Sequence, residues 1–202
     1  PKPTRTFKDR LTQVAMSPES GEEAAKLGAQ MMAFNYKPME VQKEEYEQYK
    51  LKYVECHGLN PRPLLLTDMC ICDSDASRAK ENSKYIANYL LSVLHHYDLM
   101  GDHYKNAKGY EAYGNAVDAL RETGKEGMME AYVEGQIWGT PDQMLKKFEA
   151  RKKEMGQTDC LMAFRFAGID YKTAQRSQKL FAEEVMPVLK SWEEDDAAEK
   201  AA

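Results

Sequence analysis

The sequence predicts an α/β protein in which four strand-then-helix units build a parallel sheet with right-handed crossovers. Apolar runs of strand length alternate with segments whose apolar residues recur every three or four positions. The run over residues 64–72 is almost continuously apolar, as in a strand covered on both faces. A complete (β/α)8 TIM barrel has eight such units. Four units make half of one, here with a helical insertion before the last strand.

The first unit pairs a strand over residues 11–16 with a helix that begins at residue 17. Ser17 has the chemistry of an N-cap, and Pro18 fits the first helical position because no backbone N–H is needed there. The helix is expected to stop at Gly28, a common C-terminal residue.

The second unit has a strand over 30–35 and a charged helix from Pro38 to Gly58. This helix carries its aromatic and apolar residues three and four positions apart, at Tyr46, Tyr49, Tyr53 and Cys56. In the third unit the strand over 64–72 leads into a long helix that runs from residue 73 toward Leu99.

Before the last strand comes an insertion over residues 102–132, in which one helix is predicted near 112–122. Thr140, Pro141 and Gln143 form a capping box that opens a helix to Met155. A strand over 160–166 and a last helix from residue 170 complete the fourth unit, and Pro187 is expected to kink or end that helix. We therefore expect one partial barrel over residues 1–192 and a disordered acidic tail over 193–202.

Composition excludes several classes of protein. The net charge of −5, without a basic run, argues against nucleic acid and anionic membranes as partners. No apolar stretch approaches the roughly 20 residues that cross a bilayer, and no secretion signal is present, so a cytoplasmic protein is expected. The four cysteines lack metal-ligand spacing. Adjacent helical side chains such as His95 and His96 point about 100° apart and cannot easily share a metal, so no metal site is expected.

Several motifs, in order, resemble the C-terminal half of the bacterial luciferase-like flavin-dependent monooxygenases. The resemblance covers residues 3–192 and rests on the order and spacing of the motifs together. These are PTRTFKDR at 3–10, VAMSPES at 14–20, AAKLG at 24–28, WGTPDQ at 138–143, FRFAG at 164–168, RS at 176–177 and LFAEEVMP at 180–187.

The resemblance implies a (β/α)8 barrel that binds FMN and oxidises a small organic substrate with reduced FMN and O2. A separate NAD(P)H-dependent flavin reductase would supply the reduced flavin, although some relatives use a deazaflavin instead. The first four strands of the family pattern are absent, and with them its catalytic histidine, so no catalytic residue is assigned here. The chain resembles a fragment, a truncated gene product or a shortened relative.

The resemblance places the FMN phosphate at the turn over residues 17–20, with Met16, Ser17 and Ser20 as cofactor-binding residues. A helix N-terminus at the carboxyl end of a parallel strand presents unpaired N–H groups and the positive end of the dipole. A plain N-cap explains the same residues. Glu19 satisfies the dipole but repels phosphate. Thr140 offers a second helix start, for which capping is a sufficient explanation.

Phe164 and Phe166 are predicted to share a strand face, where they line a cavity or fill the core. A half-barrel leaves sheet edges and an apolar face exposed, so we expect a homo-oligomer or a missing N-terminal half. The alternative to an enzyme is therefore a non-catalytic flavin-binding or interaction module, and a deazaflavin-dependent oxidoreductase is a further possibility.

Overall fold

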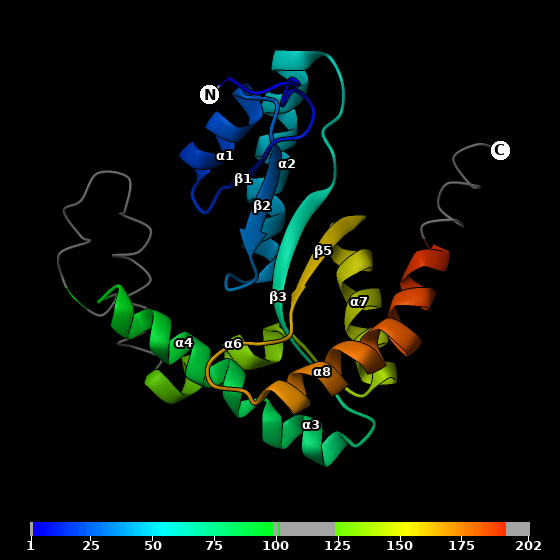
Figure 1. Ribbon diagram of the computed structural model, residues 1–202. Helices are drawn as coiled ribbons and strands as arrows, with labels where there is room; N and C mark the ends of the chain where they lie inside the picture. Colours follow the sequence, from blue (N-terminus) through cyan, green and yellow to red (C-terminus); the bar gives the residue numbers. More distant parts are fainter. Residues whose placement is uncertain (1, 99–100, 102–123, 193–202) are drawn as a thin grey trace. The chain divides into compact units, whose positions relative to one another are not determined.

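The computed structural model describes residues 2–98, 101 and 124–192 (Figure 1). These form two compact units. The first comprises residues up to 68 together with 151–161, and the second comprises 69–101, 124–150 and 162–192. The elements follow in the order β1 Thr12–Val14, α1 Pro18–Lys26, β2 Gln30–Phe34, α2 Met39–His57, β3 Leu64–Cys72, α3 Ala76–Asn82, α4 Lys84–His96, α6 Lys125–Gly135, β4 Ile137–Gly139, α7 Pro141–Met155, β5 Thr158–Ala163, α8 Tyr171–Leu180 and η2 Phe181–Val185.

The strand pairs whose register is defined are all parallel, as the alternation of strands and helices predicts. In the first unit Thr12 of β1 lies opposite Gln30 of β2, and Phe34 of β2 lies opposite Thr67 of β3. The strand β5 also pairs with β3. The predicted α/β fold with a parallel sheet is thus confirmed, and it brings the carboxyl ends of β1 and β2 side by side.

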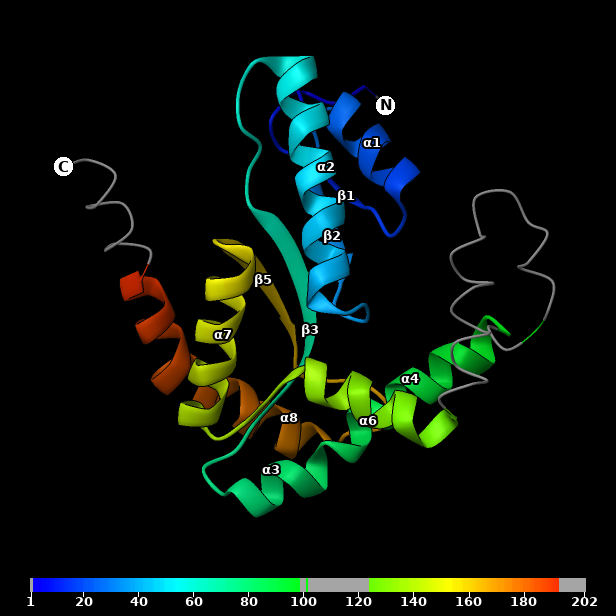
Figure 2. The same cartoon turned by 180° about the vertical axis from the view of Figure 1, so that it is seen from behind.

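One face of the sheet of the first unit is covered by α1 and α2. The helix α2 lies behind β2 in Figure 1 and in front of it in Figure 2. Their shared core is mainly small or aromatic, and the Tyr49 hydroxyl donates a 2.8 Å hydrogen bond to the Ala29 carbonyl oxygen. The buried cluster comprises Ala15, Ala24, Ala25, Met31, Ala33, Tyr46, Tyr49, Leu64, Leu66 and Met155.

In the second unit β4 pairs with the last residues of β3, with Cys70 opposite Ile137. Two buried polar bonds fasten β3 there: its Met69 N–H donates to the Gln136 side-chain oxygen at 2.8 Å, and its Cys72 N–H donates to the Ser177 hydroxyl at 2.7 Å. Among the described residues, no helix has both the length and the apolar character needed to span a bilayer.

The structure departs from the sequence prediction at several strands and helices, among them the helix α6, which was not predicted. A fifth strand, β4, was not predicted, because three residues are too few to show alternation. The helix predicted from residue 73 to Leu99 is divided at Ser83, which ends α3 and begins α4. The last strand ends at Ala163, earlier than predicted.

Pro187 does not end the last helix, which continues through residues 186–192. The π-helical turn η2 precedes it, and the Met186 N–H donates to the Phe181 carbonyl five residues earlier. This wider turn accommodates the ring that would otherwise clash with the preceding turn. The helix predicted near 112–122 and the acidic tail predicted over 193–202 lie outside the described residues.

Candidate functional site

The three residues predicted to bind the cofactor lie together at the carboxyl end of β1. This strand ends at Val14, and the N–H of the next residue, Ala15, donates a hydrogen bond to the Met32 carbonyl of β2. Two residues later, Ser17 caps α1. Met16 stands immediately before the cap and its sulfur accepts a 3.3 Å hydrogen bond from the Phe34 N–H. The turn therefore continues directly from β1 and is hydrogen-bonded to β2.

Ser17 and Ser20 form a reciprocal capping box at the start of α1. The Ser17 hydroxyl accepts from the Ser20 N–H at 3.3 Å, and the Ser20 hydroxyl accepts from the Ser17 N–H at 3.0 Å. The Ser20 hydroxyl also donates to the Ser17 carbonyl at 2.9 Å. These contacts confirm Ser17 as the N-cap, and they engage both hydroxyls inside the turn.

The Glu19 carboxylate takes the position at the helix N-terminus that favours an anion. Its pKa is lowered because the carboxylate accepts a hydrogen bond from its own backbone N–H and another from the Ser17 hydroxyl. Glu19 itself is exposed. An external anion at this helix end must therefore displace a side chain that is already there.

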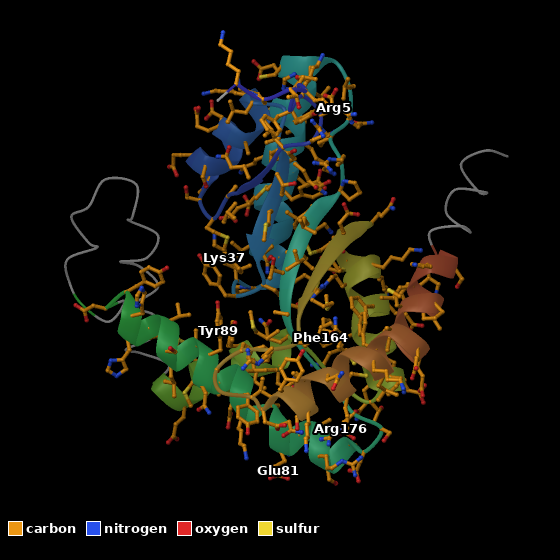
Figure 3. All side chains as sticks on the ribbon, viewed as in Figure 1. Arg5, Lys37, Glu81, Tyr89, Phe164 and Arg176 are labelled. Carbon is orange, nitrogen blue, oxygen red and sulfur yellow. The ribbon has the colours of Figure 1, made fainter. Side chains whose placement is uncertain are left out.

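Lys37 is a site residue that the sequence analysis missed. Its ammonium group donates to the Met16 carbonyl at 2.8 Å and forms a 2.6 Å ion pair with Glu45 of α2. The side chains of Lys37 and Glu45 are only 14% and 16% exposed. Figure 3 labels Lys37 beside the end of β2. A basic residue two positions after a predicted strand, in the strand–helix pair that follows the turn over residues 17–20, is the signal that could have found it.

A buried ion pair joins β3 to the end of α7 within the first unit. The Arg151 guanidinium donates two 2.7 Å hydrogen bonds to the Asp68 carboxylate, one to each oxygen. Asp68 is fully buried and Arg151 is 2% exposed. Burial alone would lower the pKa of Arg151, but the Asp68 charge raises it overall.

The buried carboxylate is connected to the loop that carries Lys37. Asn35 donates its side-chain N–H to Asp68 at 2.7 Å, and Gln42 donates to the Asn35 side-chain oxygen at 2.9 Å. The same Gln42 amide nitrogen donates to the Lys37 carbonyl at 2.8 Å. The loop from β2 to α2 is thus linked by hydrogen bonds to the buried Asp68 carboxylate, which Arg151 holds in place.

The other candidates from the sequence lie in the second unit. Thr140 forms the expected capping box, with its N–H donating to the Gln143 side chain at 2.9 Å. Phe164 contacts Phe181 and Phe166 contacts Tyr89, so the two pack in different clusters. The prediction that they share a face was wrong, because the strand ends before them and alternation no longer applies.

The histidines and cysteines form no metal site among the described residues, where no three candidate ligands gather. His95 and His96 end α4 and are exposed, while His103 lies outside the described residues. Burial raises the pKa of the Cys72 thiol to about 12, and the charges of Glu184 and Asp73 add to the shift.

The sequence matches no protein-family model and none of the curated proteins. The solved structures that share its fold include the EDTA monooxygenase of Chelativorans sp. BNC1 (TM-score 0.62, 12% identity, 89% of this chain and 44% of that one), the oxygenating constituent of 3,6-diketocamphane monooxygenase of Pseudomonas putida in complex with FMN (0.60, 18%, 87% and 47%) and the coenzyme F420 dependent tetrahydromethanopterin reductase of Methanopyrus kandleri (0.54, 18%, 86% and 49%).

The chain spans less than half the length of each of these three structures. Together with the parallel sheet, this confirms the predicted α/β fold, a half-barrel like the matched part of these three structures. At 12% to 18% identity the likeness concerns the fold alone.

Proposed function

We propose that the chain is part of a flavin-dependent oxidoreductase of the luciferase-like type and binds the flavin phosphate at the start of α1. The observation that carries the proposal is the position of this helix start. An N-cap serine begins α1 at the carboxyl end of a parallel strand, in a fold shared with an FMN complex and an F420 dependent enzyme. Ligands of open α/β sheets bind at this edge of the strands.

The residues at the turn fit a phosphate group once their side chains have rearranged. The start of α1 supplies the positive end of the helix dipole, and Ser17 and Ser20 supply hydroxyls that form charge-assisted bonds when they turn toward an anion. The group that must leave is the exposed Glu19 carboxylate. Met16, Ser17 and Ser20 would then hold the phosphate, with Met16 contributing backbone.

The chain's own contribution is binding and orientation. A bound reduced flavin would supply the electrons that reduce O2 and so activate it for oxidation of the substrate. The capped turn fixes the end of the cofactor relative to the strands, and the buried network below it keeps the β2–α2 loop in place. In the proposed enzyme a separate NAD(P)H-dependent reductase delivers reduced FMN, and the catalytic residues lie in the other half of the barrel.

Two alternatives have specific support. The match to an F420 dependent reductase favours a deazaflavin as the cofactor of a related oxidoreductase. The second alternative is a non-catalytic flavin-binding or interaction module, which an exposed apolar face on the sheet would suit. Val14 and Phe34 lie on the sheet face opposite the helix-covered residues and are 46% and 37% exposed. This exposure supports association with a second copy or with another half-barrel.

Titration of the full chain with FMN, followed by quenching of flavin fluorescence, tests the proposal. We expect saturable binding that falls at least about tenfold in the double variant S17A/S20A, since hydrogen bonds to charged groups are worth about 1.5–3 kcal/mol each. T140A is the matched control, because it removes the N-cap hydroxyl of α7 in the other unit. Coenzyme F420 serves as the competing ligand.

Absence of FMN and F420 binding would exclude a flavin site in this chain. Equal losses in S17A/S20A and T140A would show that the serines act only on helix stability. Tighter binding of F420 than of FMN would favour the deazaflavin alternative.

A further inference from the structure

The loop between β2 and α2 brings a cation to the turn that precedes α1. The Lys37 ammonium group lies 2.8 Å from the carbonyl oxygen of Met16, the residue next to the N-cap. Lys37 lies in the loop that follows β2, whereas Met16 follows β1. The hydrogen bond therefore connects the carboxyl ends of the two strands. The contact is largely shielded from solvent, because the Lys37 side chain is 14% exposed.

The position of Lys37 is set by hydrogen bonds that begin at its backbone carbonyl and lead to buried side chains. Its carbonyl accepts the 2.8 Å hydrogen bond from Gln42, whose amide nitrogen also holds Asn35. Asn35 in turn donates to Asp68, which Arg151 fixes with two hydrogen bonds. A loop restrained in this way loses little further conformational freedom when a ligand binds its side chain.

The Lys37 charge is held by a carboxylate that a stronger anion can replace. Glu45 is its ionic partner at 2.6 Å, and 16% of the Glu45 side chain remains exposed to solvent. A phosphate group carries more charge than one carboxylate and offers several acceptor oxygens, so it competes well for an ammonium group. Lysine binds phosphate as a compact point charge with three donors, which suits a shared position between a backbone carbonyl and an anion.

We infer that Lys37 is the residue by which this site distinguishes a phosphorylated flavin from an unphosphorylated one. This inference rests on the proposed function and adds a residue to it that the resemblance did not include. Lys37 keeps its bond to the Met16 carbonyl and turns its remaining donors from Glu45 to the phosphate. The buried network does not touch the ligand, and its members are positioning residues for Lys37.

The test compares the affinities of the full chain for FMN and for riboflavin, which lacks the phosphate. In K37M we expect the FMN affinity to fall at least about tenfold, as for loss of one charge-assisted bond, with riboflavin affinity within about twofold of the parent. K37R should restore part of the preference for FMN, because the charge is retained. E45Q should increase the preference, because the competing carboxylate is gone.

K43M is the matched control. Lys43 lies on α2 and pairs with Glu154 at 3.3 Å in an exposed position, so its removal changes the net charge equally without touching the turn. A K43M variant with the parent's preference, beside a K37M variant that has lost it, supports the inference. Riboflavin binding by each variant reports whether the fold is intact.

The inference fails if K37M keeps the parent's ratio of FMN to riboflavin affinity, or if K37M and K43M lower it equally. It also fails if K37M loses both ligands together, since Lys37 would then act on the structure alone. Absence of FMN binding by the parent chain would overturn the proposed function as well, whereas FMN binding with an unchanged ratio in K37M overturns only the role of Lys37.

Discussion

Replacing Arg151 with Met tests whether the buried ion pair holds the first unit together. The substitution removes both 2.7 Å hydrogen bonds to Asp68 and leaves the carboxylate, which is fully buried, with the bond from Asn35. The methionine fills most of the volume of the lost side chain. The effect is therefore that of an uncompensated buried charge rather than of a cavity.

Breaking a buried pair by removing one partner costs about 3–5 kcal/mol. For a chain of this size each kcal/mol corresponds to roughly 2–4 °C, so the midpoint of thermal unfolding should fall by about 6–20 °C. The double variant D68L/R151M removes both charges. It should be more stable than R151M, because apolar replacement of a whole buried pair is often neutral, although Asn35 loses its acceptor.

Equilibrium unfolding in urea, followed by far-ultraviolet circular dichroism, measures these differences. K43M provides the comparison with an exposed pair, for which a change below about 1 kcal/mol is expected. A loss below about 1 kcal/mol in R151M would refute the reasoning. So would a double variant less stable than R151M, since the cost would then not come from the unpaired Asp68 charge.

Three further predictions concern single residues. E19Q should tighten FMN binding by about two- to fivefold, as expected for removing a charge at a helix end; weaker binding in a fluorescence titration would contradict this. A167G should stabilise the chain by about 1 kcal/mol in urea unfolding, because Ala167 has a φ of 47° in the turn closed by the Ile169 N–H and the Phe166 carbonyl; no gain would contradict it. At pH 8 iodoacetamide should modify the exposed Cys56 much faster than the buried Cys72, whose pKa is about 12, and equal labelling in peptide mass spectra would disprove the burial of Cys72.

Local sequence chemistry predicted the helices that begin with a side-chain cap, such as α1 and α7, because caps involve residues three or four positions apart. Ser17 caps α1, and α7 begins at Pro141 and ends at Met155 as the capping box and the following glycine indicate. The three-residue strand β4 could not be found in this way. Its pairing with the end of β3 depends on residues far away in the sequence, and its own composition shows no period.

The candidate site likewise contains residues that a local motif predicts and residues that only the fold brings together. Met16, Ser17 and Ser20 lie in one turn, so a motif places them together. Asp68 and Arg151 are 83 positions apart and meet only because β3 and α7 are neighbours in the fold. Glu45 reaches Lys37 because α2 folds back onto β2, which no local pattern specifies. Contacts of this kind follow from the topology rather than from any motif.

Hydrogen exchange measured by mass spectrometry, with and without FMN, tests most directly whether a flavin phosphate binds where α1 begins. FMN should slow exchange in peptides that cover residues 15–24, while peptides over 138–148, which contain the comparable start of α7, keep their rates. Unchanged exchange over 15–24 at saturating FMN, or protection confined to 138–148, would contradict the account.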